Sequence, residues 1–131
     1  MMRRNRQQSV VGTDREQHAG DFLPLRPVEF HVLLSLTAGE RHGYGIIQDA
    51  NRRGERMAPD VGTLYRALRR MKEQGLIAGA DRRRAPDAGD ERRTYYRITA
   101  LGRQVARTEA RRLEALTRAA RTGGLLEEKT T

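Results

Sequence analysis

The chain has 131 residues, of which 33% are charged, and it carries a formal net charge of +9 and no cysteine. This length suits one domain with loose ends, and the absence of cysteine excludes disulfides, thiolate zinc sites and cysteine nucleophiles. No apolar run is long enough to span a membrane and no signal-peptide core follows the first arginines, so we expect a cytoplasmic protein.

The basic excess indicates a polyanionic partner, most often nucleic acid. Only two of the 26 basic residues, Lys72 and Lys129, are lysine. Such an arginine bias fits a GC-rich genome as well as it fits phosphate binding. The positions of the arginines along the chain therefore have to decide between these two interpretations.

The two ends of the chain differ from its middle. Residues 1–22 are polar and show no periodicity, which predicts a flexible arm, and residues 123–131 start with a double glycine and predict a disordered tail. We expect one domain in residues 23–99 and a separate long helix in residues 100–122.

The first predicted helix covers residues 25–39, with Pro27 in its first turn and Gly39 as its stop. Apolar residues at helical spacing occupy most of its sides: Val28, Phe30, Val32, Leu33, Leu34 and Leu36, with Thr37 in line. Such a helix must be buried on most sides, in a core or a subunit interface. An isolated histidine in this setting, His31, is a tolerated or interface side chain more often than a ligand.

The second predicted helix covers residues 44–54 and ends at Gly54. Its inward stripe comprises Ile46, Ile47 and Ala50. His42 and Tyr44 flank Gly43 at its start, where Gly43 lets the chain turn sharply. Their residue types suit an acid–base pair, but nothing else in the sequence supplies a reaction. Because a helix N-terminus attracts phosphate, we predict a phosphate clamp here, in which Tyr44 donates its hydroxyl and His42 either assists or packs in the turn.

The third predicted helix, residues 60–75, has Asp60 as a favourable N-cap and Gly75 as a natural stop. One face is apolar, with Val61, Leu64, Leu68 and Met71 at helical spacing. The opposite face is mostly polar and basic: Gly62, Thr63, Tyr65, Arg66, Arg69, Arg70 and Lys72.

The next segment predicts two strands joined by a loop. Leu76 and Ile77 begin the first strand, and residues 94–98 alternate as a half-buried second strand. Residues 85–91 are rich in turn formers. Folding of this hairpin gathers five arginines at one tip, namely Arg82, Arg83, Arg84, Arg92 and Arg93. Acidic residues share the tip, so a salt-bridged, solvated loop is the alternative interpretation.

Three helices followed by a hairpin give the order of a winged helix-turn-helix. Its third helix enters the major groove and presents the outward residues of its first turns to the bases. Gly62, Thr63 and Arg66 would meet base edges, whereas Tyr65, Arg69 and Arg70 would meet phosphates. In the wing, Arg92 and Arg93 would contact the backbone or the minor groove.

The fourth predicted helix starts at the cap Thr99 and runs to about Arg121. Small and apolar residues form a short coiled-coil-like seam, which predicts a dimerisation arm that packs with the first helix of a second copy. Six arginines, with Glu109 and Glu114, cover the rest of its surface. The predicted dimer contacts are Phe30, Leu33, Ala106, Ala110, Leu113, Leu116, Thr117 and Ala120. The alternative is a helix that folds back on its own domain.

Three blocks of the sequence, "HGYGII", "GTLYRALRRMKEQGLI" and "RRTYYRITALG", resemble in this order the PadR family of bacterial transcriptional regulators. The resemblance extends from about Leu25 to Leu116 and is closest to the smaller subfamily, which has a single short C-terminal helix. It implies a winged helix with a dimerisation helix, and a homodimer that binds a palindromic operator in double-stranded DNA and usually represses.

The chain also departs from the family pattern. Family members often respond to small aromatic or drug-like molecules, some of which bind in a cavity at the dimer centre lined by aromatics including tryptophan. This chain has no tryptophan, so a small-molecule effector in such a cavity is not supported by its sequence. The family also commonly has an acidic residue where this chain has Gly45.

Catalysis finds no support in the sequence. His18, His31 and His42 lie in different segments, unlike a helical metal-ligand pair, and no glycine-rich loop matches a nucleotide-binding motif. We therefore expect no enzyme, no metal and no cofactor. Besides specific DNA recognition, two binding hypotheses remain: a nonspecific or architectural nucleic-acid-binding winged helix, and a winged helix whose third helix meets an acidic protein.

Overall fold

The computed structural model describes residues 19–54, 59–80 and 94–127. A short helical turn at residues 19–21 precedes α3 (Pro27–Leu36), β1 (Arg41–His42), α4 (Gly43–Arg52), α5 (Val61–Glu73), β2 (Ile77–Ala80), β3 (Tyr95–Ile98) and α6 (Ala100–Thr122). The four predicted helices and both predicted strands are therefore present. The predicted hairpin tip, with Arg82, Arg83, Arg84, Arg92 and Arg93, lies outside the described residues.

The helices start and stop where local chemistry dictates. Asp60 accepts a hydrogen bond from the Thr63 amide, and Thr99 accepts one from the Gly102 amide, so both are N-caps as predicted. Gly75, just beyond the end of α5, has a φ of 82°, a conformation that favours glycine over residues with a Cβ.

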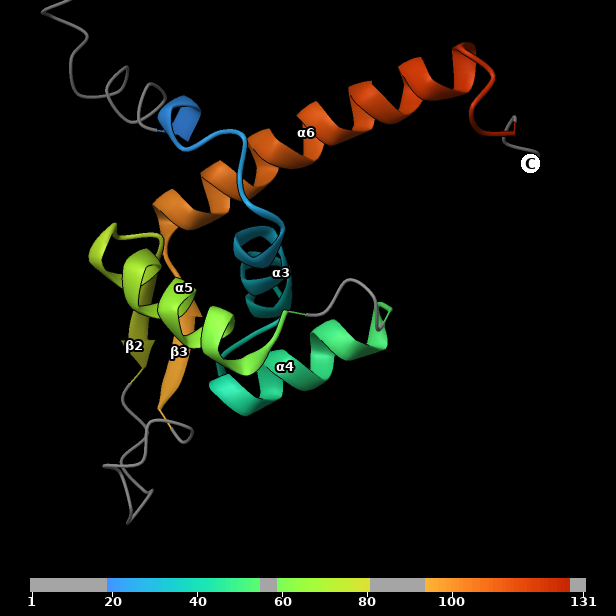
Figure 1. Cartoon of the computed structure of the whole chain (residues 1–131). Helices are drawn as coiled ribbons and strands as arrows, with labels where there is room; N and C mark the ends of the chain where they lie inside the picture. The colour runs from blue at the N-terminus through green and yellow to red at the C-terminus, as the bar shows by residue number, and fades with distance from the viewer. Residues whose placement is uncertain (1–18, 55–58, 81–93, 128–131) are drawn as a thin grey trace, which may run out of the picture.

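The core lies around α3, which packs against α4, α5, α6 and β3 (Figure 1). Val32 and Leu33 of α3 are fully buried. The core side chains that surround them come from every other element except β1: Ile46, Leu64, Ala67, Leu68, Met71, Ile77, Tyr96, Val105 and Ala106. One consequence corrects a prediction, because Leu33 and Ala106 lie inside the chain's own core and offer almost no surface to a second copy.

The sheet has three strands in the order β1-β3-β2, all antiparallel, where the sequence predicts two. The extra strand β1 pairs Arg41 with Tyr96 and His42 with Tyr95. A strand of two residues is too short for a period-2 pattern, so its sequence carries no signal. Its effect is to join the start of α4 to β3.

Two apolar positions differ from the predicted faces. Val61 is 56% exposed, because it occupies the first position of α5, beyond the edge of the core. Leu34 of α3 is also partly exposed, while Ser35 beside it is buried. The buried face of α3 is therefore rotated relative to the face that apolar spacing alone predicts.

Ser35 is buried because it belongs to a polar network that joins α3 to α4. Asp49 accepts hydrogen bonds from the Ser35 hydroxyl at 2.8 Å and from the Arg53 guanidinium at 2.6 Å. Arg53 also donates to Nδ1 of His31 at 3.1 Å. Burial raises the pKa of Asp49, but the hydrogen bonds from Ser35 and Arg53 outweigh it and lower that pKa overall. His31 is thus a structural acceptor, and burial together with the Arg53 charge lowers its pKa.

Glu109 joins α6 to the segment that leads into α3. Its side chain is only 2% exposed, although the sequence predicts it on the solvent face of the helix. Oε2 accepts a hydrogen bond from the Leu25 amide at 3.1 Å, and both carboxylate oxygens accept from Arg112, at 2.6 and 3.0 Å. The carboxylate therefore satisfies a backbone donor that lies 84 residues away in the sequence.

We predict that Glu109→Gln destabilises the protein by about 1–3 kcal/mol at neutral pH, as expected for loss of a buried charged hydrogen bond. The hydrogen bonds from Arg112, and then that from Leu25, lower the pKa of Glu109 despite its burial. A carboxyl whose pKa is lowered on folding stabilises the protein above its unfolded pKa, about 4.3, and loses this contribution as pH falls toward its folded pKa.

The free-energy difference between wild type and Glu109→Gln should therefore be largest near neutral pH and shrink below about pH 4.3. Urea unfolding followed by circular dichroism, at one protein concentration and several pH values, measures this difference. Glu114→Gln is the matched control, because that side chain is 72% exposed on the same helix. Equal effects of the two substitutions at every pH would contradict the assigned role of Glu109.

Candidate nucleic-acid interface

The first turn of α5 carries a chain of three polar side chains. Asp60 accepts a hydrogen bond from the Thr63 amide at 2.8 Å and another from the Thr63 hydroxyl at 3.1 Å. The Thr63 hydroxyl in turn accepts from the Arg66 guanidinium at 3.3 Å. The two hydrogen bonds from Thr63 lower the pKa of Asp60. Arg66 is thereby held across the exposed start of the helix.

This arrangement changes what Thr63 can do. Its hydroxyl donates to Asp60 and accepts from Arg66 in the free protein, so a base edge would have to displace one of these partners. The methyl group makes no such contact and can meet a thymine methyl. Thr63 is consequently better suited to orient Arg66 and to touch an apolar group than to read a hydrogen-bond pattern.

The outward side of α5 presents Gly62, Arg66 and Arg69, all exposed, as the sequence predicts. Val61 is a further exposed residue at the same end of the helix, and the sequence interpretation missed it by assigning it to the core. The sequence feature that could have indicated this exposure is the position of Val61 directly after the N-cap Asp60. The first residue of a helix often lies beyond the surface on which the helix packs. The exposed first turn thus combines small, apolar and cationic groups.

Arg70 does not belong to this outward side, which corrects the prediction of a phosphate contact. Its guanidinium donates to Oε2 of Glu29 at 3.1 Å, and the Glu29 carboxylate is 11% exposed. Glu29 also accepts from the Arg26 amide at 2.8 Å. Position 70 lies one step further around α5 than Arg69, so its side chain turns back toward α3. The ion pair fixes the two helices to each other.

Tyr65 is also directed inward rather than to phosphate, since its hydroxyl oxygen is buried. It packs on Gly43, at the start of α4, where an added Cβ would lie only 2.8 Å from Cε1 of the tyrosine ring. Gly43 has no positive φ, so the predicted sharp turn is not the reason for glycine at this position. The reason is steric, because the absence of a side chain lets α5 approach α4.

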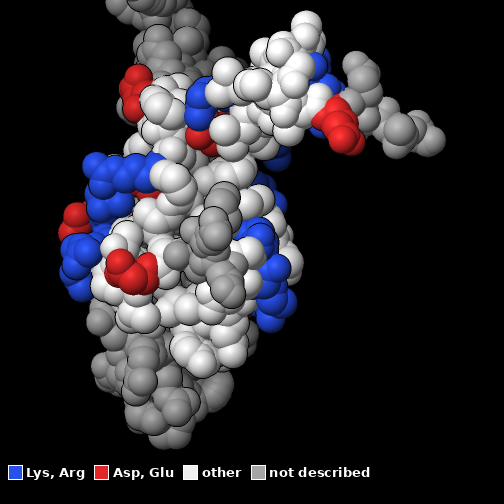
Figure 2. All heavy atoms as spheres, turned by 45° about the vertical axis from the view of Figure 1, so that its right-hand side comes forward, with Lys and Arg blue, Asp and Glu red and all other residues white. Residues whose placement is uncertain are grey.

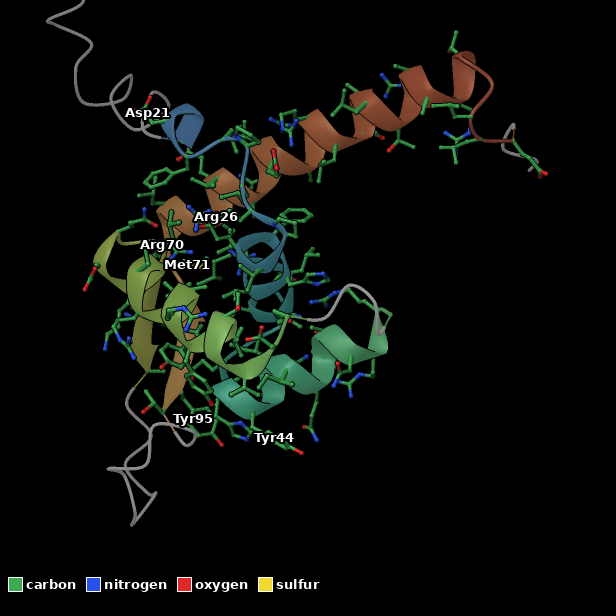
Figure 3. The ribbon with its side chains drawn as sticks, in the orientation of Figure 1. Asp21, Arg26, Tyr44, Arg70, Met71 and Tyr95 are labelled. Atoms are coloured by element: carbon green, nitrogen blue, oxygen red, sulfur yellow. The ribbon has the colours of Figure 1, made fainter. Side chains whose placement is uncertain are left out.

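His42, Tyr44 and Tyr95 form an aromatic cluster where α4 and β3 begin. The His42 ring lies 5.2 Å from the Tyr95 ring and 6.5 Å from the Tyr44 ring, measured between centroids. Tyr44 and Tyr95 lie at the same end of the molecule, where β2 ends and β3 begins (Figure 3). Tyr44 is 52% exposed, so its hydroxyl is available to a partner.

His42 itself is the N-cap of α4. Its Nδ1 accepts a hydrogen bond from the Gly45 amide at 2.9 Å, which requires that nitrogen to be unprotonated. A Cβ at Gly45 would lie 3.4 Å from two atoms of the His42 ring, an ordinary contact. The structure therefore explains glycine at position 43 but does not require it at position 45.

On the face drawn in Figure 2, the basic side chains of the described residues lie in separate groups, with acidic side chains beside them. Several arginines neutralise acids within the fold, as Arg53 does with Asp49 and Arg112 with Glu109. The count of 26 basic residues thus overstates how many cationic side chains remain for a partner.

Other kinds of site find no support in the described part of the chain. Within residues 19–54, 59–80 and 94–127, no three His, Cys, Asp or Glu side chains gather in a way that could hold a metal ion. The same residues include no helix that is long and apolar enough to cross a bilayer.

These observations define a class of protein. Three packed helices, with the third presenting an exposed first turn, together with a small antiparallel sheet, are the elements of a DNA-binding winged helix. Residues 32–108 match the Transcriptional regulator PadR-like family, and the chain belongs to this family. The family consists of regulators, not enzymes, and the resemblance seen in the sequence is confirmed.

Individual proteins agree with the assignment. Transcriptional regulator Rv3488 of Mycobacterium tuberculosis is 36% identical over 91 residues, which cover 70% of this chain and 79% of that protein. The fold resembles the crystal structure of a PadR family transcription regulator from Clostridium difficile, with a TM-score of 0.62, 23% identity, and coverage of 72% of this chain and 95% of that one. A transcriptional regulator from Clostridium thermocellum has a TM-score of 0.60 at 25% identity, and the match covers 72% of this chain and 87% of that one.

We predict that Gly43→Ala destabilises the protein by about 1–3 kcal/mol, because the new methyl group overpacks the contact with Tyr65. Gly45→Ala is the matched control two residues along the same helix. It should leave stability unchanged or raise it by up to about 1 kcal/mol, since alanine favours helix over glycine. Urea unfolding measures both variants, and equal behaviour of the two would refute the proposed steric role of Gly43.

Proposed function

We propose that this regulator is a homodimeric repressor that binds an inverted-repeat operator and reads it with the first turns of α5. The observation that carries the proposal is the division of α5 into two faces. Leu64, Ala67, Leu68 and Met71 are buried, while Val61, Gly62, Arg66 and Arg69 are exposed. A helix fixed on one side by core packing is a rigid support for readout on the other.

Arg66 is the proposed base-reading residue. A guanidinium can donate two parallel hydrogen bonds to O6 and N7 of guanine, and Arg66 lies within the first two turns of α5. Gly62 leaves room for a close approach to the bases, while the methyl groups of Thr63 and Val61 suit thymine. Arg69, one turn further along, suits a phosphate.

Backbone contacts complete the proposed interface. Tyr44 would donate its hydroxyl to a phosphate near the N-terminus of α4, where helix amides add attraction. His42 supports this role by capping α4 beside Tyr44. Arg92 and Arg93 of the wing remain proposed contacts to the backbone or minor groove, as the sequence predicts.

The proposed dimer is based on a difference in burial between the two halves of α6. Gly102, Val105, Ala106 and Glu109 face the chain's own body and are buried. Leu113, Leu116 and Ala120 continue the same face at steps of four, three and four residues, but Leu116 is 54% exposed. The second half of α6 projects beyond the body of the protein (Figure 1).

The exposed half of this apolar stripe suits contact with a second copy of the chain. In a two-fold dimer, the same stripe of each copy would cover that of the other. Ala110 and Thr117, both exposed, flank this stripe, and the half-buried Phe30 of α3 can take part. Leu33 and Ala106 are left out because the core buries them. The repressor role follows from the family resemblance, since a dimer on an operator can block access to the promoter.

We predict that Arg66→Ala relaxes base preference at one position of each half-site by about 1–3 kcal/mol, because a bidentate contact to guanine is lost. Selection of bound sequences from a random DNA pool, followed by affinity measurement on each single-base variant, measures the change. Wild type should select an inverted repeat with half-sites about one helical turn apart.

Arg69→Ala is the matched control on the same face of α5. It should weaken all sequences alike and reduce the slope of log affinity against log salt by about one unit. If Arg66→Ala also weakens all sequences equally, Arg66 is only a phosphate contact. Selection of no common sequence by wild type would favour nonspecific or architectural binding, and absence of DNA binding would favour an acidic protein partner.

We predict that Leu113→Arg converts the dimer to monomers at micromolar concentration, because the substitution places a charge in the apolar stripe of α6. Ala115→Arg adds the same charge on the opposite side of the helix and should leave the dimer intact. Sedimentation velocity measures the mass of each variant. A dimeric Leu113→Arg protein would rule out this stripe as the contact.

A further inference from the structure

Arg66, the proposed base-reading residue, is held by a relay of hydrogen bonds that begins at Asp60. The Asp60 carboxylate accepts from the Thr63 amide at 2.8 Å and from the Thr63 hydroxyl at 3.1 Å. The same hydroxyl accepts from Nη2 of Arg66 at 3.3 Å. Because an ionised carboxylate only accepts and a guanidinium only donates, the hydroxyl can join them in one direction alone. The relay therefore fixes one arrangement of the three side chains.

The relay lies on the outside of α5, at the start of the helix. Asp60 is the N-cap and is exposed, as are Gly62 and Arg66. A Cβ on Gly62 would lie 3.4 Å from Nη1 of Arg66 and 3.6 Å from Oδ1 of Asp60. The guanidinium thus bends back over the first turn and rests against this glycine. The first turns are the part of a recognition helix that reaches the bases.

The charge of Asp60 has a second consequence. The hydrogen bonds from the Thr63 amide and hydroxyl lower the pKa of Asp60, so its carboxylate is ionised at neutral pH. Nonspecific binding to DNA depends almost entirely on attraction between cationic side chains and phosphates. A carboxylate beside Arg66 weakens this attraction and repels a phosphate that approaches. A guanine edge, by contrast, carries no net charge and offers O6 and N7 as acceptors to the guanidinium.

We propose that Asp60 determines specificity, because it positions Arg66 through Thr63 for contact with a base and disfavours a phosphate in the same place. Loss of its charge would raise affinity for DNA of unrelated sequence and lower discrimination at the base that Arg66 reads. This role rests on the proposed function, since it requires that Arg66 faces a base. The positioning of Arg66 is a property of the free protein and is measured without DNA.

Asp60→Asn is the substitution that tests this role. Asparagine caps helices as well as aspartate does, and its side-chain oxygen can still accept from the Thr63 amide. Its NH₂ group cannot accept from the Thr63 hydroxyl, so the relay is interrupted while the cap is kept. Thr63→Val removes the hydroxyl and leaves the charge of Asp60, which separates the two effects. Glu73→Gln, at the other end of α5 and exposed, is the matched control for loss of one negative charge.

The first measurement follows the Nε–Hε NMR signal of Arg66 in the free protein. Its heteronuclear NOE should fall in Asp60→Asn and Thr63→Val, because the guanidinium is released, and should keep the wild-type value in Glu73→Gln. An unchanged signal in Asp60→Asn would overturn the positioning role.

The second measurement compares affinities, at one salt concentration, for the selected operator, for its variant at the base that Arg66 reads, and for DNA of unrelated sequence. Asp60→Asn should bind unrelated DNA severalfold more tightly than wild type. It should also lose about tenfold in discrimination at that base, as expected when a hydrogen bond to a charged group is lost. Thr63→Val should lose the discrimination without the gain on unrelated DNA. Equal effects of Asp60→Asn and Glu73→Gln would overturn the proposal.

A double variant separates this role from a general effect on stability. Because Asp60 acts through Arg66, addition of Asp60→Asn to Arg66→Ala should cause no further change in discrimination at that base. A further loss would show that Asp60 acts by another route and would overturn the proposal. If wild type selects no common sequence although its Arg66 signal is rigid, the proposed function and the specificity role fail, whereas the positioning of Arg66 stands.

Discussion

Burial of α3 on nearly every side is the constraint on which the other elements depend. Val32, Leu33 and Leu36 are at most 1% exposed, and α4, α5, α6 and β3 all pack against this one helix. Because α3 holds the outer elements together, the direction of α5 is set by contacts on its inner face. The outward residues of α5 can then be substituted without loss of core packing. A surface that reads DNA requires this independence.

The arginines divide into those that hold the fold together and those that remain exposed. Arg70 engages Glu29 between α5 and α3, whereas Arg53 engages Asp49 at the end of α4 and Arg112 engages Glu109 within α6. Removal of such an arginine would leave a poorly solvated carboxylate without its counter-ion. The resulting loss of stability exceeds the net stabilisation that the intact ion pair contributes. Arg66, by contrast, reaches only Thr63 among the hydrogen bonds of the described residues. A count of basic residues therefore says less about DNA binding than whether each arginine already forms a salt bridge within the fold.

Local signals in the sequence predicted most of the fold. The caps Asp60 and Thr99 and the stop Gly75 depend on neighbours within a few residues, so they can be identified without knowledge of the tertiary structure. Glu109 could not be found in this way, because its partner Leu25 is 84 residues distant. The same holds for the candidate site. Exposure of Arg66 follows from helical spacing, whereas the inward turn of Tyr65 depends on a glycine in another helix.

Glu109 also connects the fold to the proposed dimer. It is the last buried residue of α6, so this carboxylate lies close to the point where the helix projects from the body. The direction in which the exposed half of α6 projects is set there, by a hydrogen bond to Leu25 and by packing on α3. In a two-fold dimer formed through that half, a change of direction at this point would alter the separation of the two α5 helices. The spacing of operator half-sites would then depend on a residue that touches no DNA.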